Sequence, residues 1–597
     1  MQIRRVDIEN FRGIKHLSWR IPKGRKFVVL IGPGDSTKST VLTAIEMALS
    51  QRWNLTIHDT DFYMADVSQP ISIRVTLDDL PQELRRHDVL GMSLCGIDEA
   101  GELYEDPEDE HDACVTIALT VDSSLEPRWT AHRPGKIGDE VRVTTTARAL
   151  VGAYKVDERV DAHLRWTKTS ALGRLTDARH GTAQLLATAS RAARDSVAQS
   201  IPDELAQLTA AVQEKLHAMG SGEFTDLKAG LDQSLSSSTG TLALYEGPIP
   251  LTNYGLGSRR LAAIATQHLA HEGKAVLLID EVEQGLEPHR LIGLLRELRR
   301  PGAYSHVVAT THSPTVLRQL DASDLAIVRR SNNGDVAIAS VSADDEDMQK
   351  LFRTSPEAFL ARRVVVCEGK TEFGIALELM QEWDAARAAA GSPSSAALGV
   401  VAVEAGGGTA AIKCSSLLFD AGYDVVLFMD SDVPDDNIQA DALLERGISV
   451  VRWQDGFNSE RAACEVLDAD GLTKLIRAAV TLADHPDSAE ATYLDNLRKH
   501  NGGRKVPGLD VSEWQEAGIS IAEARQVVAE TASKFKWFKR VDKGRELARQ
   551  ILRGVSLYGS DVGTKLDMLN GAIYRSHMSS ASNINEQEIA QAKATKP

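Results

Sequence analysis

One short segment near the start of the chain limits the fold more than any other. Residues 27–31 read Phe-Val-Val-Leu-Ile, an unbroken apolar run that stops at Gly32. Such a run is typical of a central strand that is covered on both faces. After a loop, apolar side chains recur at helical spacing over 38–50. A buried strand, a loop and a helix in this order predict an α/β fold built on parallel strands.

Strand-like and helical segments alternate along the rest of the chain. Residues 147–235 are rich in alanine and glutamine and predict a helical insertion, whereas the acidic stretch 331–346 predicts a boundary between two α/β units. Residues 470–550 have a mainly helical pattern. The last residues of the chain, rich in Ser, Asn, Gln and Lys, predict a flexible tail. Further strands are expected at 71–77, 114–119, 140–145, 275–279, 306–309, 325–328, 363–367, 399–403, 424–429 and 448–453.

Composition excludes several classes of protein. The 597 residues include 67 Lys and Arg against 84 Asp and Glu, a net charge of −17, so a generally basic nucleic-acid binder is excluded. Basic residues are nevertheless concentrated at 1–26 and 534–553, with eight in each stretch. Five cysteines without a CxxC pair exclude a disulfide scaffold and a thiolate zinc site. No apolar run reaches 18 residues and the N-terminus lacks a signal-peptide core, so we expect a cytoplasmic protein without membrane spans.

The loop after the first buried strand has the chemistry of a phosphate site. Residues 32–39 match the pattern G-x-x-x-x-G-K-[ST] except that Thr37 replaces the second glycine, where a β-branched residue resists positive φ. Backbone N–H groups would surround the phosphates, Lys38 would neutralise charge and Ser39 would hold Mg²⁺. The expected nucleotide contacts are Gly32, Gly34, Asp35, Ser36, Thr37, Lys38, Ser39 and Thr40.

Three later segments complete a nucleotide site. The apolar run 275–279 ends in Asp280 and Glu281, which would hold Mg²⁺ through water and polarise the attacking water. Gly257 and Ser258 open a helix, and such helix N-termini bind anions. His312 follows the strand at 306–309 and is a candidate contact for a γ-phosphate, although a lone histidine is more often structural.

The order of these motifs resembles that of ABC-type ATPases of the SMC and RecF kind, over roughly residues 1–350. Asn10-Phe11-Arg12-Gly13 and the loop 284–288 also resemble segments of that family. The resemblance implies one ATP with one Mg²⁺, a homodimer in which Ser258 acts on the partner's nucleotide, and a discontinuous ATPase domain at 1–146 and 236–350. The helical block 147–235 would be a dimerisation element, because no long coiled-coil pattern is present.

A second set of motifs places carboxylates at strand ends. Glu368 follows the apolar run 364–367, and Glu372 lies four residues later on an expected helix. Asp430 and Asp432 follow a second apolar run, and alternation along a strand would put both on one side. Carboxylates gathered at one sheet edge repel one another unless cations share them, and oxygen ligands suit Mg²⁺ or Mn²⁺.

This second pattern resembles the Toprim domain, and an ABC-type ATPase ahead of Toprim resembles the OLD (overcoming lysogenization defect) nucleases of class 2 and the nuclease of the Gabija anti-phage system. The resemblance implies an ATP-regulated DNA endonuclease that cuts with two metal ions. Its Toprim nuclease domain would span 361–580, with a helical insertion at about 470–530, and a tail would follow at 581–597. Glu368, Glu372 and Asp430 would bind one ion and Asp432 part of the other.

Two roles stay open between neighbouring residues. The resemblance implies a further acid, for which Glu460 is favoured over Glu465, and a lysine that stabilises developing charge, for which Lys539 and Lys543 are candidates. The implied partners are DNA, a second copy of the chain and a UvrD-like helicase, in anti-phage defence or DNA repair. The main alternative is a RecF/SMC-like DNA-binding ATPase clamp whose Toprim carboxylates are structural. A topoisomerase would need a separate domain with a nucleophilic tyrosine, and none is visible in this sequence. A primase would need a set of zinc-binding cysteines, which this sequence lacks.

Overall fold

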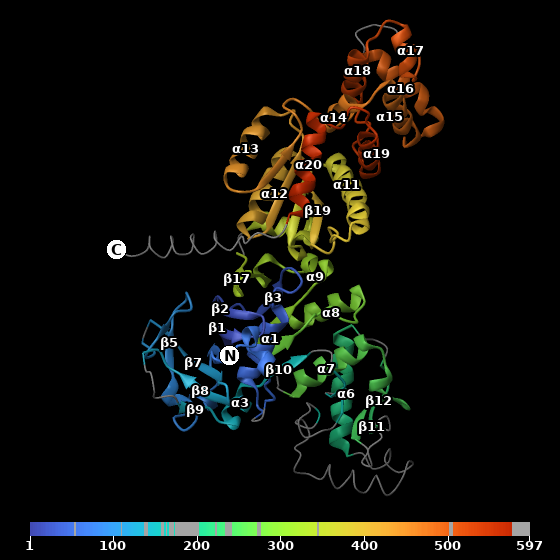
Figure 1. Ribbon diagram of the computed structural model, residues 1–597. Helices are drawn as coiled ribbons and strands as arrows, with labels where there is room; N and C mark the ends of the chain where they lie inside the picture. The colour runs from blue at the N-terminus through green and yellow to red at the C-terminus, as the bar shows by residue number, and fades with distance from the viewer. Residues whose placement is uncertain are drawn as a thin grey trace. The chain divides into compact units, whose positions relative to one another are not determined.

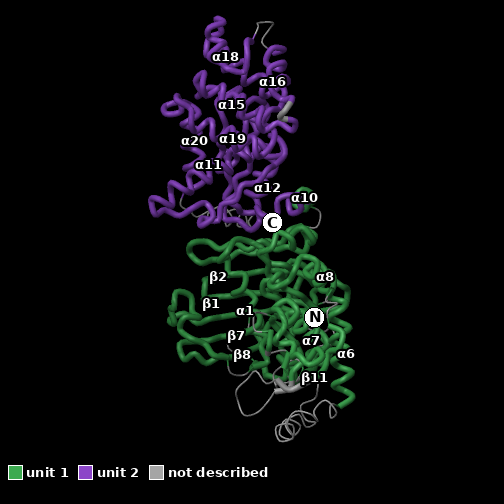
Figure 2. Tube along the Cα trace, turned by 90° about the vertical axis from the view of Figure 1, so that its right-hand side faces the viewer, with its two compact units in different colours: residues 1–349 green, residues 350–597 purple. Residues whose placement is uncertain are grey.

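The chain forms two compact units in a computed structural model, residues 1–349 and 350–597 (Figure 2). The predicted tail at 581–597 lies outside the described residues. The structure describes residues 1–575 except 53–54, 109, 136–140, 157–159, 163, 166–171, 173–201, 221–223, 233–240, 271–275, 343–344 and 501–505.

A large mixed sheet is the framework of unit 1. Five of its strands are parallel neighbours, in the order β10 (Ala153–Val156), β14 (Val276–Ile279), β15 (His306–Thr310), β3 (Phe27–Ile31) and β16 (Leu325–Arg330). The sheet continues through β17 (Asp335–Ser340), β2 (Ile14–Arg20), β1 (Gln2–Phe11), β4 (Ile71–Asp78), β7 (Asp112–Val121), β5 (Cys95–Ile97) and β6 (Leu103–Tyr104). Strand β8 (Pro127–His132) pairs with β7 and with β9 (Val141–Arg142).

This order explains why the expected nucleotide motifs can meet. All five residues of β3 are buried, as the apolar run predicts. Strand β15 lies between β3 and β14, and the three strands are parallel, so their carboxyl ends share one edge. The segments that follow them carry the phosphate loop, the Asp280–Glu281 pair and His312, and ligands of parallel sheets bind at such an edge.

Helices flank this sheet and supply the loops around it. Helix α1 (Lys38–Leu49) begins at the end of the phosphate loop and buries Val41, Leu42 and Ile45, as the helical spacing predicts. Among the described residues of unit 1, the other α-helices are α2 (Gln82–Arg85), α3 (Thr145–Val151), α6 (Asp203–Ala218), α7 (Leu256–Ala270), α8 (Pro288–Leu298) and α9 (Pro314–Gln319), and α10 (Glu346–Thr354) ends at the start of unit 2.

One sequence expectation for unit 1 is wrong in secondary structure. The range 147–235, expected to be helical, contains β10, which pairs with β14 in the main sheet, and β11 (Leu227–Asp232). Strand β11 forms a separate three-stranded sheet with β12 (Thr241–Glu246) and β13 (Ile249–Pro250). The expected boundary 331–346 contains β17, which pairs with β16 and β2, and the chain divides into its two units just after it, between residues 349 and 350. Pairing with a distant strand outweighs local composition in such short segments.

Unit 2 is built on a four-stranded parallel sheet. Its order is β19 (Val400–Glu404), β18 (Arg363–Cys367), β20 (Asp424–Met429) and β21 (Ser449–Arg452), at the positions that the apolar runs predict. The apolar side chains of β18 and β20 form one core with the helices. The helices that pack against this sheet are α11 (Lys370–Ala389), α12 (Gly408–Asp420), α13 (Pro434–Glu445) and α20 (Asp561–Tyr574) (Figure 1).

The remaining helices of unit 2 form the part that the sequence predicts as a helical addition. Figure 1 shows α15 (Ala469–Thr481), α16 (Pro486–His500), α17 (Val511–Glu516) and α18 (Ile521–Lys534) gathered together. Helix α14 (Ser459–Val466) precedes them, and α19 (Val541–Leu552) follows them and returns to α11. Across the described residues of both units, no helix combines the length and the apolar character that a membrane span needs.

Candidate functional site

The phosphate loop is folded around the Lys38 side chain. Lys38 Nζ donates to the carbonyl oxygens of Gly32 and Pro33 at 2.9 and 2.7 Å, and to Ser36 Oγ at 3.1 Å. Burial lowers the pKa of Lys38 to about 8, although Asp35 and Asp280 oppose the shift. The loop is therefore already closed around its cation, as a phosphate site requires.

The backbone of this loop uses conformations that favour glycine. Gly32 has φ 141°, and a Cβ there would lie 2.5 Å from the carbonyl oxygen of Val328. A Cβ at Gly34 would meet nothing within 4 Å. Thr37 adopts the left-handed region, with φ 72° and ψ 12°, so the position where the sequence lacks the usual glycine is strained. Thr40 lies in the first turn of α1.

Asp280 meets the hydroxyl group that is expected to hold Mg²⁺. Asp280 Oδ1 accepts hydrogen bonds from Ser39 Oγ and from Thr310 Oγ1, both at 2.8 Å. Lys155, on β10, lies 3.6 Å from Asp280 Oδ2 and donates to Thr43 Oγ1 at 3.0 Å. The sequence does not single out Lys155, because this residue lies in the stretch expected to be helical. Thr310 is the last residue of β15, just before His312.

Glu281 and His312 lie on the same side of the site as Lys38. Glu281 has φ 49°, and its N–H donates to Thr310 Oγ1 at 2.8 Å. The His312 N–H donates to Glu283 Oε1 at 2.6 Å. Burial, followed by the charge of Lys38, lowers the pKa of the His312 imidazole, whereas Glu283, Glu281 and Asp280 raise it. The structure therefore brings the expected acid, histidine and lysine together.

The turn at the start of α7 is closed within a single chain. A Cβ at Gly257 would lie 2.1 Å from the carbonyl oxygen of Gly285, so only glycine permits this contact. Ser258 is 6% exposed, and its Oγ accepts from Arg290 Nη1 at 3.1 Å. Action of Ser258 on a partner's nucleotide stays an expectation, and the hydroxyl, which accepts from Arg290, would donate its proton to a phosphate oxygen.

In unit 2, the end of β18 and the loop after β20 are joined through Glu368. The Glu368 N–H donates to the carbonyl oxygen of Phe428 at 3.0 Å, and the Asp430 N–H donates to Glu368 Oε2 at 2.9 Å. Strand β20 ends at Met429, so Asp430 and Asp432 lie in the loop beyond it. Strand alternation is therefore the wrong reason for their proximity, and the loop itself brings them to the sheet edge.

Glu372 and Glu460 approach this edge from two helices. Glu372, in the first turn of α11, is buried, and its Oε2 accepts from the Gly369 N–H at 3.0 Å. Glu460, in the first turn of α14, is 0% exposed, and within the described part of the chain neither of its carboxylate oxygens has a hydrogen-bond partner. Burying such a group without hydrogen-bond partners costs free energy.

The charges of these groups act on one another. Burial and then Glu372 raise the pKa of Glu368 to about 7. Burial, followed by Glu372, Glu368 and Glu460, raises the pKa of Asp430 well above its ordinary value. Burial also raises the pKa of Glu460, with Lys539 opposing and Glu372 and Asp432 adding to the shift. The carboxylate group, defined as Glu368, Glu372, Asp430, Asp432 and Glu460, therefore shares one local field.

The structure distinguishes the two lysine candidates. Partial burial lowers the pKa of Lys539, but Glu460, Glu372, Asp430 and Glu368 together raise it above its ordinary value. Burial lowers the pKa of Lys543, and its charged neighbours are Arg540, Asp484 and Asp542. Only Lys539 thus lies within reach of the carboxylate group. Glu465 pairs with Arg461 at 3.8 Å and is not among the charges that act on this group.

Lys539 is placed by the packing of two helices. It lies in the loop between α18 and α19, in which Trp537 and Phe538 are buried and Phe535 is exposed. Thr371 Oγ1, at the start of α11, donates to the carbonyl oxygen of Phe538 at 2.9 Å. The basic, aromatic stretch predicted at 534–553 therefore packs two of its aromatic rings into the core and presents Lys539 to the carboxylate group.

The donor set suits a hard divalent cation, although no ion site is fully formed. Among the described residues, no three His, Cys, Asp or Glu side chains converge as they would around a bound ion. The two oxygens of buried Glu460 nevertheless have no hydrogen-bond partner in the described part of the chain, and Lys539 is the cation whose charge acts on them most strongly. Oxygen ligands of this kind fit Mg²⁺ or Mn²⁺, which bring positive charge to such a cluster.

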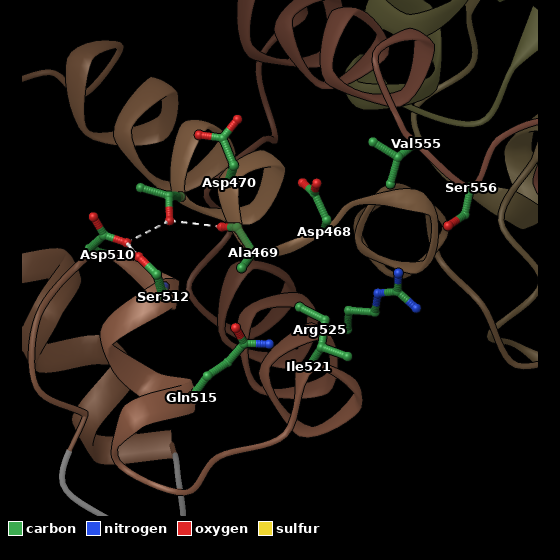
Figure 3. A pocket seen from close by; sticks show the side chains of 11 residues that line it. Asp468, Ala469, Asp470, Asp510, Ser512, Gln515, Ile521, Arg525, Val555 and Ser556 are labelled. Carbon is green, nitrogen blue, oxygen red and sulfur yellow. Dashed lines mark hydrogen bonds between the residues drawn. The ribbon is translucent and has the colours of Figure 1, made fainter.

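A separate pocket of about 620 Å³ lies in the helical addition and contains none of the carboxylate group (Figure 3). Its acids already have structural roles. Asp468 caps α15 through the Gly471 N–H at 2.8 Å, and Asp510 accepts from the Ser512 N–H at 3.0 Å. Asp470 pairs with Lys474 at 2.5 Å. The pocket therefore gives no indication of a ligand.

Comparison with known proteins bears on unit 1. Residues 114–318 match the family described as "AAA domain, putative AbiEii toxin, Type IV TA system", and residues 1–77 match the family described as "Protein of unknown function (DUF2813)". No curated relative matches the sequence. The first match indicates an AAA-type ATPase domain in this part of the chain, and unit 2 lies outside both matches.

Three solved structures align with more than half of the chain. An SmcHead bound to the C-winged helix domain of ScpA is 15% identical over 58% of this chain and 100% of its own, with a TM-score of 0.37. The SMC head domain from Thermotoga maritima is 12% identical over 57% and 100%, with a TM-score of 0.29. The Smc head domain derived from Pyrococcus furiosus, with an extended coiled coil, is 14% identical over 59% and 98%, with a TM-score of 0.35.

Proposed function

We propose that this chain is an ATP-regulated, divalent-metal-dependent DNA endonuclease, with the carboxylate group of unit 2 as its cleavage site. The observation that carries the proposal is Glu460, a fully buried carboxylate without hydrogen-bond partners among the described residues, in one field with the four other acids of the carboxylate group and Lys539. Burying such a group costs stability, and a bound cation would offset that cost. The resemblance to the Toprim domain of OLD nucleases supports the same function.

The resemblance to the Toprim domain supplies the roles of the residues in this proposal. Glu368, Glu372 and Asp430 would hold one ion, and Asp432 with Glu460 would hold part of a second. Mg²⁺ or Mn²⁺ bound there supplies Lewis-acid charge and lowers the pKa of a bound water. Lys539 keeps its proton, because the acids raise its pKa, and would stabilise negative charge on the phosphate that is cut. The basic loop around it would contact the DNA backbone.

The nucleotide site would regulate this cleavage. Lys38, Ser39 and Asp280 would hold ATP with its magnesium ion, and Glu281 and His312 lie beside them. In this proposal Ser258 of one chain completes the ATP site of a second copy, so that ATP favours a homodimer. A UvrD-like helicase partner and a role in anti-phage defence or DNA repair belong to the same proposal through the OLD resemblance.

Nicking of supercoiled plasmid tests the cleavage site. We expect the wild-type chain to nick with Mn²⁺ or Mg²⁺ and to stop when EDTA is added. Asp430→Asn keeps the shape of the side chain but removes its charge, so nicking should fall by roughly 100-fold or more. Asp435→Asn is the matched control, since Asp435 is an exposed aspartate on α13, and it should nick like the wild type.

Lys38→Ala tests regulation by ATP. Loss of a buried ammonium that faces the phosphates should weaken ATP binding by roughly 10- to 100-fold, because charge-assisted hydrogen bonds contribute about 1.5–3 kcal/mol. Nicking by the wild type should change severalfold on addition of ATP, and nicking by the variant should not. Lys26→Ala, at an exposed lysine before β3, is the control. Nicking that ignores ATP in the wild type would contradict the regulatory role.

The alternative is a DNA-binding ATPase clamp with a non-catalytic carboxylate group. It is favoured by the lack of a converged three-ligand metal site among the described residues. The plasmid experiment separates the two functions. A wild-type chain that binds ATP and DNA but does not nick with either metal would support the clamp.

A further inference from the structure

A single buried hydroxyl group lies between two members of the carboxylate group. Ser459 is 0% exposed. Its Oγ lies 2.9 Å from Glu372 Oε1 and 2.9 Å from Asp430 Oδ1. The same oxygen accepts a hydrogen bond from Trp453 Nε1 at 2.9 Å. One atom thus contacts two acids that come from different elements, α11 and the loop after β20.

The hydrogen-bonding capacity of serine shows what this contact does. A serine hydroxyl has one proton and two lone pairs. The indole N–H of Trp453 uses a lone pair, so the proton points to the side of Glu372 and Asp430. The single proton can be donated to only one of these acids at a time, so the two share one hydroxyl, and both lie 2.9 Å from the same oxygen. Ser459 therefore sets the distance between these two acids.

Ser459 is itself held rigidly. It is the first residue of α14, whose N-cap Asn458 accepts from the Arg461 N–H at 2.9 Å and donates through Nδ2 to Ser533 Oγ at 2.9 Å. Trp453 is buried and meets the Phe428 ring edge-on, with centroids 5.4 Å apart. The hydroxyl cannot move without disturbing the start of α14, which also carries Glu460.

We propose that Ser459 is a positioning residue that holds Glu372 and Asp430 at the spacing needed to bind a divalent cation. The inference rests on the proposed metal-dependent function and adds a residue that touches neither DNA nor the reacting atoms. Trp453 acts through Ser459 by fixing the direction of its hydroxyl group. Partners that orient metal ligands in this way typically contribute 10- to 100-fold to metal affinity.

Calorimetric titration of the full chain with Mn²⁺ tests the proposal without relying on activity. We expect Ser459→Ala to weaken Mn²⁺ binding by roughly 10- to 100-fold and Ser459→Thr, which keeps the hydroxyl, to retain most of it. Trp453→Phe keeps an aromatic side chain but replaces the indole and removes its N–H, so it should weaken binding less than Ser459→Ala. Ser415→Ala is the control, since Ser415 is a buried serine of α12 whose hydroxyl has no partner among the described residues.

The outcomes separate this inference from the proposed function. Mn²⁺ binding to Ser459→Ala as tight as to the wild type overturns it, and so does a wild type that binds no Mn²⁺. A wild type whose Mn²⁺ affinity depends on Ser459 but which does not nick plasmid supports the positioning role and contradicts the nuclease. A wild type that nicks, with unchanged Mn²⁺ affinity in Ser459→Ala, contradicts the positioning role alone.

Discussion

Glu460→Gln is expected to melt at a higher temperature than the wild-type chain in EDTA, while its plasmid nicking falls by roughly 100-fold or more. The substitution removes a buried charge, whereas the amide that replaces it is still a buried polar group. The gain is therefore limited to the cost of the charge itself, which burial imposes and Lys539 only partly offsets, and about 1 kcal/mol of such cost corresponds to roughly 2–4 °C for a unit of this size. Stability and activity should therefore change in opposite directions.

The pH dependence of this gain has a definite sign. Burial raises the pKa of Glu460 above its ordinary value of 4.5. As the pH rises through that ordinary value, the unfolded chain loses the proton first, so the folded wild type loses stability until the raised pKa is passed. The advantage of the Glu460→Gln variant over the wild type should be absent below the ordinary pKa, grow through this window and stay constant above it. Thermal melts in EDTA over a pH series measure it.

Metal and control variants complete this experiment. Mn²⁺ should raise the melting temperature of the wild type, because a cation that binds only the folded chain stabilises it, and should raise that of Glu460→Gln much less. Glu465→Gln should change neither melting nor nicking, since Glu465 is only partly buried and pairs with Arg461. A Glu460→Gln chain that nicks normally would falsify the role of Glu460 at the cleavage site.

The sequence predicts well those features that depend on neighbouring residues. The strand at 27–31, the phosphate loop and α1 follow one another directly, so local pattern and observed structure agree. The strands that carry Glu368 and Asp430 are likewise short, buried runs that end where the acids begin. Thr37 stands out in the sequence because a β-branched side chain disfavours the positive φ that this loop position needs. Its φ of 72° shows that the loop keeps the conformation despite this cost.

Features that depend on distant pairing could not be predicted in the same way. Strand β10 has no pattern that separates it from the alanine-rich stretch around it, and it is a strand because β14 pairs with it. The choice between Lys539 and Lys543 depends on the contact between Thr371 and Phe538, which are 167 positions apart. Ser459 gave no signal, because a single serine beside a glutamate is common in any sequence.

The crossing of α11 and α19 depends on a pair of glycines, and α19 follows the loop that carries Lys539. A Cβ at Gly544 would lie 2.4 Å from the carbonyl oxygen of Thr371, and one at Gly374 would lie 2.3 Å from that of Val541. Both obstacles are backbone atoms, which cannot rotate away as a side chain can. The two helices can therefore approach this closely only without side chains at these positions.

Gly544→Ala is expected to destabilise unit 2 by about 2–3 kcal/mol, as overpacking does, and to lower its melting temperature by roughly 4–10 °C. Because α19 follows directly on the loop that carries Lys539, nicking by the folded fraction should fall as well. Gly571→Ala is the control, since a Cβ at this exposed glycine of α20 would meet nothing within 4 Å. An alanine in an open helical position should stabilise by about 1 kcal/mol. Equal melting temperatures for the two variants would show that the crossing tolerates a side chain and that Lys539 is held by other contacts.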